Sequence, residues 1–126
     1  MEITHYLGDG FLVDFVNEIQ KKLIKHNYRA IFDALRKHIK WLEEYGHIGI
    51  NQQKSEATKK LKGSDVWELK VKNLRIMFVP KNKRIILLSW FIKETKKTPS
   101  NEIETAETRL KEYVRRENEK EKKKYH

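Results

Sequence analysis

The stretch from Trp67 to Lys93, "WELKVKNLRIMFVPKNKRIILLSWFIK", determines the fold. Its apolar residues recur at every second position, which is the period of a β-strand with one buried face. The turn signals "KN" and "PKNK" divide it into three segments, at residues 67–72, 74–79 and 84–93. Connections this short join antiparallel neighbours. The sequence therefore predicts a three-stranded antiparallel meander.

The alternation divides the side chains of this meander between two faces. One face is apolar throughout and comprises Trp67, Leu69, Val71, Leu74, Ile76, Phe78, Ile86, Leu88, Trp90 and Ile92. The other face is mixed and comprises Glu68, Lys70, Arg75, Met77, Val79, Ile85, Leu87, Ser89, Phe91 and Lys93. We expect helices to cover the apolar face and solvent to reach the cations of the mixed face.

Two amphipathic segments precede the meander and are expected to supply those helices. Apolar side chains follow the i, i+3/i+4 spacing of a helix from residue 11 to 23 and again from residue 31 to 45. Asn27 is a good N-cap for the second helix, and Gly46 is a good stop. The short break between them predicts an antiparallel helical hairpin. Residues 2–7 can form a short edge strand.

The segments on either side of the meander differ in their patterns. Residues 47–65 have no sustained period and are expected to form a basic loop. After the meander, Pro99 suits the first turn of a helix that Thr98 or Ser100 can cap. The apolar stripe of this C-terminal helix ends at Val114.

The expected fold class is α+β, with a small antiparallel sheet, the meander plus the possible N-terminal strand, packed on the helical hairpin and followed by a C-terminal helix. The chain of 126 residues is long enough for one domain with a modest core, at residues 1–114, followed by a charged tail at residues 115–126. It has no cysteine, which excludes disulfides and thiolate metal sites. No apolar run approaches the ~20 residues that span a bilayer, and no signal peptide is recognisable. We therefore expect a soluble, cytoplasmic protein without membrane contact.

The positive charge is concentrated in the middle of the chain. The formal net charge is +10, and residues 54–98 contain 13 basic and 4 acidic residues. The remainder of the chain is nearly neutral. A concentrated excess of cations favours an anionic partner, such as nucleic acid or an acidic protein.

The segment from Leu61 to Tyr113, "LKGSDVWELKVKNLRIMFVPKNKRIILLSWFIKETKKTPSNEIETAETRLKEY", resembles the HigB branch of the RelE/ParE toxin superfamily, including its phage-derived members. The shared pattern is a Lys-Gly loop, a Trp-Glu-Leu strand, a strand that begins next to an arginine, and a Leu-rich strand. It ends with a Phe-x-Lys segment, a Lys-Thr-Pro and a helix. The chain departs from the pattern at Lys70, where the family has arginine, at Leu74, where it has tyrosine, and at Glu94, where it has lysine.

The resemblance implies a RelE-like fold and the toxin of a type II toxin–antitoxin pair. Such toxins cleave messenger RNA on the ribosome without a metal or other cofactor, and a cognate antitoxin neutralises them. The antitoxin implied here is a helix-turn-helix protein of the HigA type.

The cations of the mixed face are the candidate catalytic residues: Lys70, Arg75 and Lys93. Metal-free RNA cleavage needs a base, an acid and cations that stabilise charge on the phosphate. A guanidinium matches phosphate geometry, so Arg75 is the leading candidate for that role. Candidate RNA-binding residues are Lys60, Lys62, Phe91, Lys96 and Lys97, of which the phenyl ring can stack a base.

Two alternatives remain open. One is a toxin without catalysis on the same scaffold, as in the gyrase-inhibiting branch. The other is a plain nucleic-acid-binding module, although the helices lack a helix-turn-helix and the sheet lacks the paired exposed aromatics of an RRM. The five histidines have no motif partner and are expected to be structural or on the surface.

Overall fold

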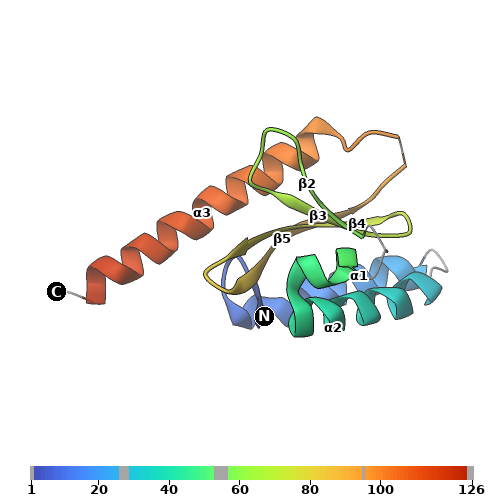
Figure 1. Ribbon diagram of the computed structural model, residues 1–126, viewed down its shortest axis with the longest axis horizontal. Helices are drawn as coiled ribbons and strands as arrows, with labels where there is room; N and C mark the ends of the chain where they lie inside the picture. Colours follow the sequence, from blue (N-terminus) through green and yellow to red (C-terminus); the bar gives the residue numbers. More distant parts are fainter. Residues whose placement is uncertain (1, 26–28, 53–56, 95, 125–126) are drawn as a thin grey trace.

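A five-stranded sheet lies between a helical hairpin and a long C-terminal helix (Figure 1). The computed structural model describes residues 2–25, 29–52, 57–94 and 96–124. The strand order is β1-β5-β4-β3-β2. The elements are β1 (Glu2–His5), a 3₁₀ turn (Asp9–Phe11), α1 (Leu12–Lys25), α2 (Arg29–Gln52), β2 (Thr58–Lys60), β3 (Trp67–Val71), β4 (Leu74–Lys81), β5 (Arg84–Ile92) and α3 (Ser100–Lys124).

The predicted meander is confirmed as β3, β4 and β5, which pair antiparallel in sequence order. The β4–β5 connection is a two-residue turn, in which Asn82 and Lys83 both have positive φ. Such a turn matches the twist of a hairpin. The predicted edge strand is confirmed as β1, which pairs parallel with β5.

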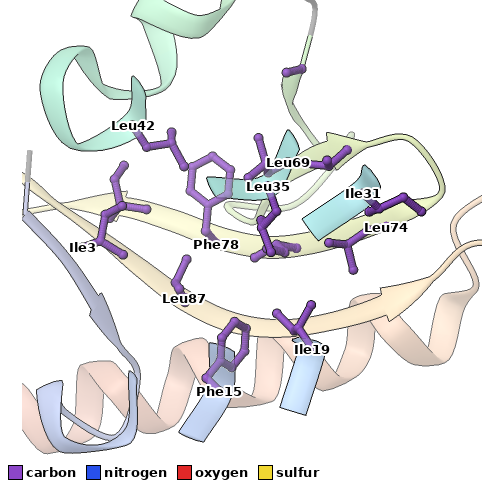
Figure 2. Close-up of a cluster of buried hydrophobic side chains, with 14 of the residues drawn as sticks. Ile3, Phe15, Ile19, Ile31, Leu35, Leu42, Leu69, Leu74, Phe78 and Leu87 are labelled. Carbon is purple, nitrogen blue, oxygen red and sulfur yellow. The ribbon is translucent and has the colours of Figure 1, made fainter. Parts of the chain in front are cut away.

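The hairpin face of the sheet holds the larger apolar cluster, as predicted. Phe78 and Leu87 from the sheet pack with Phe15 and Ile19 of α1 and with Leu35 of α2 (Figure 2). The helical period and the strand period place these side chains on facing surfaces. Burial of this cluster is what joins the hairpin to the sheet.

A β-bulge interrupts the alternation of β5. Met77 pairs with Ser89 and Phe78 pairs with Leu87, which leaves Leu88 as an extra residue. One extra residue exchanges the two faces of a strand on either side of it. The predicted faces of the first half of β5 were therefore wrong, because a run of apolar residues gives no sign of a bulge. The hairpin side is lined by Ile85 and Leu87, and the opposite side by Ile86 and Leu88.

The opposite face of the sheet is covered by α3, so the expectation of a solvent-exposed mixed face was wrong. Ala106 and Tyr113 of α3 form a second apolar cluster with Met77, Ile86 and Leu88. The helix crosses above the sheet and continues beyond it (Figure 1).

Residues 47–65 contain two elements that the sequence does not predict. Gly46, with φ 71° and ψ −176°, breaks α2 as predicted, but helix resumes after the kink and ends at Gln52. The short strand β2 then pairs antiparallel with β3. Three residues are too few for a period to be recognised. The predicted N-cap, Asn27, lies outside the described residues.

The C-terminal helix begins at Ser100 and extends to Lys124 without a break. Its first turn is closed by backbone bonds to the carbonyl of Pro99. Thr98, one of the two predicted caps, bonds a side chain of β3 instead. In the part of the chain that the structure describes, no helix has the length and apolar character needed to cross a membrane.

Candidate nucleic-acid interface

Three of the predicted site residues form one row across the sheet. Lys70 of β3 pairs with Arg75 of β4, and Arg75 pairs with Phe91 of β5. Lys93 follows two residues later, where its backbone N–H donates to Asn73 at 2.7 Å. The outer two strands of the row are about 10 Å apart. The sheet therefore brings the three predicted catalytic residues to one end of its α3 face.

Arg75 is buried and already has partners. Its side chain is only 8% exposed, and Nε lies 2.9 Å from Oε1 of Glu68. Its Nη1 donates to the carbonyls of Leu74, at 3.0 Å, and Lys72. A guanidinium held in this way stabilises the sheet and the β3–β4 turn. The expectation of a solvent-exposed arginine was therefore wrong.

Glu68 is the central residue that the sequence argument missed. Its side chain is 3% exposed, with one oxygen beside Arg75 and the other accepting a 2.9 Å hydrogen bond from the Thr98 hydroxyl. The contact with Thr98 ties the loop after β5 to β3. Glu68 is the diagonal cross-strand neighbour of Arg75, and such neighbours interact. The alternating pattern could therefore have identified this pair.

Phe91 is not a free platform for a nucleotide base. The residue is 8% exposed and belongs to the apolar cluster under α3. A ring that stacks on a base must present a face to solvent. The expectation that Phe91 lies on an uncovered sheet face was therefore wrong, because α3 covers this part of the sheet.

The lysines predicted for the site lie in two groups. Lys70, Lys96 and Lys97 are exposed and Lys93 is half-buried, all around the end of β5 and the loop that follows it. The exposed Lys60 and Lys62 lie on β2 and in the turn after it. Lys60 pairs with Trp67, three residues before Lys70 on β3, about 10 Å along the strand.

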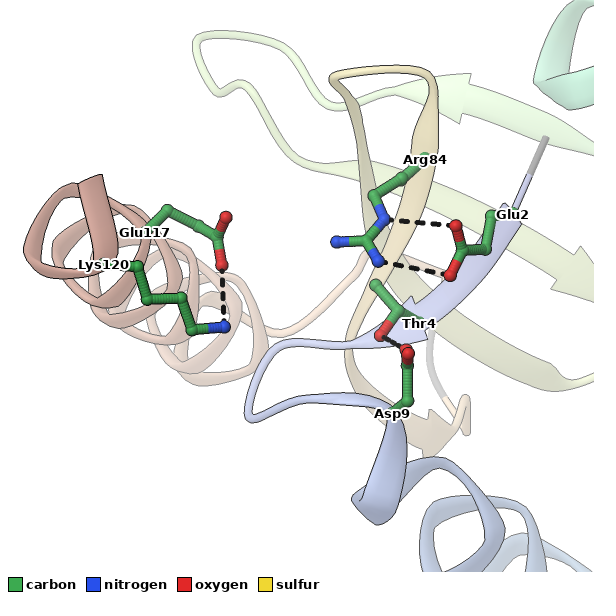
Figure 3. Close-up of polar contacts among 6 residues, drawn as sticks. All are labelled: Glu2, Thr4, Asp9, Arg84, Glu117 and Lys120. Carbon is green, nitrogen blue, oxygen red and sulfur yellow. Dashed lines mark hydrogen bonds and ion pairs between the residues drawn. The ribbon is translucent and has the colours of Figure 1, made fainter. Parts of the chain in front are cut away.

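A separate polar cluster lies at the other end of β5 (Figure 3). Arg84 forms a two-pronged contact with Glu2 at 3.2 and 3.5 Å, which joins β1 to β5. The Thr4 hydroxyl bonds Asp9, and Lys120 pairs with Glu117 on α3 at 3.4 Å. Most of the cations here have a carboxylate partner, so the cluster has little charge left for a ligand.

His5 is a buried histidine at the end of β1. Its ring lies 5.3 Å from the ring of Phe15 and 4.5 Å from that of Tyr6, and its Nδ1 accepts from the Leu7 N–H. Burial, together with the charge of Arg109, lowers the pKa of His5 from 6.5. A neutral, packed imidazole has a structural role. Within the described ranges, no three carboxylate or imidazole groups come together as a metal site.

One family model matches the chain. Its description is "Phage derived protein Gp49-like (DUF891)", and the match covers residues 31–111. The matched segment contains α2, all strands except β1, and the first half of α3. It includes every predicted site residue. No curated protein sequence matches the chain at a significant level.

Proposed function

Because the chain belongs to the phage-derived Gp49-like family, whose members are RelE/HigB-type toxin-like proteins, we propose that it is the toxin of a type II toxin–antitoxin pair. In this proposal it cleaves messenger RNA on the ribosome, and a cognate antitoxin of the helix-turn-helix, HigA-like type neutralises it. The observation that carries the proposal is the match over residues 31–111. The cations at the end of the α3 face support it.

Lys70 and Lys93 are the proposed contacts to the scissile phosphate. Both lie beside Arg75, and both are accessible to a ligand. Preorganised cations stabilise the charge that develops on a phosphate in the transition state, by about 3–4 kcal/mol each. Arg75 contributes indirectly, because its ion pair with Glu68 joins β4 to β3, which carries Lys70. Glu68 also accepts a hydrogen bond from Thr98 in the loop that follows Lys93.

The reaction we propose is transesterification of the RNA backbone. The 2′-oxygen bonds to the adjacent phosphorus and loses its proton to a base, while the bond from phosphorus to the 5′-oxygen breaks and that oxygen takes up a proton. The products are a 2′,3′-cyclic phosphate and a 5′-hydroxyl. Lysine is one of the side chains that serve as general acid or base in catalysis.

The outer lysines are proposed to hold the RNA backbone on both sides of the cut. These residues are Lys60, Lys62, Lys96 and Lys97. Contacts of this kind are electrostatic and independent of sequence, and each adds to the salt dependence of binding.

Induced expression tests this proposal. The wild-type chain should arrest growth, with new 5′-hydroxyl ends inside coding sequences, mapped by sequencing of RNA ends. The variant Lys70→Ala/Lys93→Ala should lower cleavage by about 10²-fold or more. The matched control is Lys21→Ala/Lys22→Ala, which removes two exposed lysines from α1. Intact messenger in arrested cells would overturn the proposed reaction.

A second candidate is a toxin of the gyrase-inhibiting type, which does not cleave RNA. The ion pair that occupies Arg75 favours it, because that arginine is not available to a phosphate. Growth arrest with DNA damage and intact messenger would identify this function. Tight RNA binding without growth arrest would instead identify a plain nucleic-acid-binding module.

A further inference from the structure

A groove runs along α3 on the side that faces the turn after β2. Its volume is about 890 Å³. One wall is a single stripe of α3 that begins at Glu107 and ends at Asn118. The eleven steps from the first to the last of these residues rise about 16 Å, which is three turns of helix. The opposite wall is formed by Ser64 and Asp65, and a smaller hollow of about 390 Å³ continues past them to Lys62.

The floor of this groove is apolar. Leu110 and Val114 are half-buried members of the α3 stripe, and Val79 and Pro80 lie below them at the end of β4. These aliphatic side chains suit the apolar face of a protein segment. Trp67 also lines the groove, where it is half-buried and its ring centroid lies 6.3 Å from that of Phe78, so the floor combines aliphatic side chains with an indole.

The rim of the groove is basic. It carries four cations, Lys60, Lys81, Lys111 and Arg115, and two carboxylates, Asp65 and Glu107. Arg115 is paired with carboxylates of its own helix. In the described part of the chain, Lys81 and Lys111 are exposed and form no ion pair. A partner with acidic residues beside an apolar stripe complements this charge.

We infer that this groove binds an acidic, amphipathic helical segment of about three turns that belongs to the antitoxin. The inference rests on the proposed toxin function and adds the site and the chemistry of the partner. The segment places its apolar stripe on Leu110 and Val114, and its carboxylates meet Lys81 and Lys111. It also covers Lys60, one of the lysines proposed to hold RNA. Neutralisation then follows from competition for that part of the surface.

The test is the dissociation constant between the purified chain and the protein encoded by the adjacent reading frame, measured by calorimetry. The variant Lys81→Glu/Lys111→Glu should raise the dissociation constant by about tenfold or more. It should also reduce the dependence of binding on salt. Both side chains are exposed, so the variant should fold normally. A second variant, Val114→Glu, should weaken binding by a similar factor, because it places a charge on the apolar floor. The matched control, Lys21→Glu/Lys22→Glu, makes the same change in net charge on α1 and should stay within about threefold of the wild type.

Several outcomes would overturn the inference. These are the absence of binding by the wild-type chain, equal weakening by the control, or unchanged binding by both groove variants. A groove variant that loses affinity only for a short oligoribonucleotide would assign the groove to RNA. A wild-type dimer that the groove variants dissociate, seen by light scattering, would assign it to a second copy of the chain. Because binding is measured on purified proteins, these results do not depend on RNA cleavage in cells.

Discussion

The two faces of the sheet are both covered by helix, but they enclose different chemistry. The side under the hairpin is closed almost entirely by aliphatic and aromatic side chains. The side under α3 has a smaller apolar cluster and encloses the pair of Glu68 and Arg75. A buried ion pair is often no more stabilising than apolar residues of the same volume. The hairpin side therefore holds the larger apolar cluster, whereas the α3 side adds a buried ion pair that need not stabilise the fold.

The largest expected effect comes from a substitution in the apolar cluster on the hairpin side of the sheet. Phe78 is fully buried there, and the adjacent Met77 is fully buried on the α3 side. Phe78→Ala should lower the free energy of unfolding by about 3–5 kcal/mol, because it leaves a cavity in the larger cluster. Met77→Ala is the matched control. It should lower the free energy of unfolding by about 2 kcal/mol or more, but by less than Phe78→Ala does. Urea denaturation measures both, and a greater loss for Met77→Ala would contradict the comparison.

A smaller effect is expected from the ion pair of the α3 side. Glu68→Met leaves the charge of Arg75 buried without its carboxylate partner. It should lower the free energy of unfolding by about 3 kcal/mol. The double variant Glu68→Met/Arg75→Met removes both charges and should be more stable than the single variant by about 1 kcal/mol or more. Urea denaturation of the two variants measures the difference.

The same pair of variants separates structure from function. If the pair serves the site, the double variant folds but no longer cleaves RNA or arrests growth. Full activity in a well-folded double variant would show that Arg75 has no part in the function. A double variant less stable than Glu68→Met would contradict the account of the buried charge.

The sequence predicts the architecture well because its strands and helices have strong periods. The meander, the helical hairpin and the α3 stripe all follow from them. The bulge at Leu88 does not, because Ile85 to Leu88 are all apolar and a shift of one residue changes nothing in the pattern. The short β2 was missed for a related reason, since three residues show no period.

The candidate site is only partly predictable for the same physical reason. Alternation correctly places Lys70 and Arg75 on one face, but it does not reveal what covers that face. The cover depends on the path of α3, which is set by packing between elements distant in sequence. Arg75 and Phe91 therefore became buried, whereas Lys70 stayed exposed.

The smallest expected effect concerns His5, a buried polar side chain on the hairpin side, packed against Phe15 of α1. In the folded chain burial lowers its pKa from 6.5, and the nearby charge of Arg109 acts in the same direction. Below pH 6.5 the unfolded chain therefore binds more protons at this residue than the folded chain does. The free energy of unfolding should fall as the pH drops below 6.5, and this contribution should level off once the folded imidazole is also protonated.

The contacts of His5 explain why its charged form is disfavoured. In the folded chain, Nδ1 accepts a hydrogen bond from the Leu7 N–H, so a proton on Nδ1 would point at that N–H and break the bond. The positive charge would also lie among aromatic rings. Urea denaturation between about pH 8 and pH 5.5 measures how the free energy of unfolding changes with pH, and His5→Gln should reduce this change. An unchanged slope in His5→Gln would show that the hairpin side tolerates a charge. The contrast between the two faces would then rest on packing alone, since a buried charge would be acceptable without the carboxylate partner that Arg75 has on the α3 side.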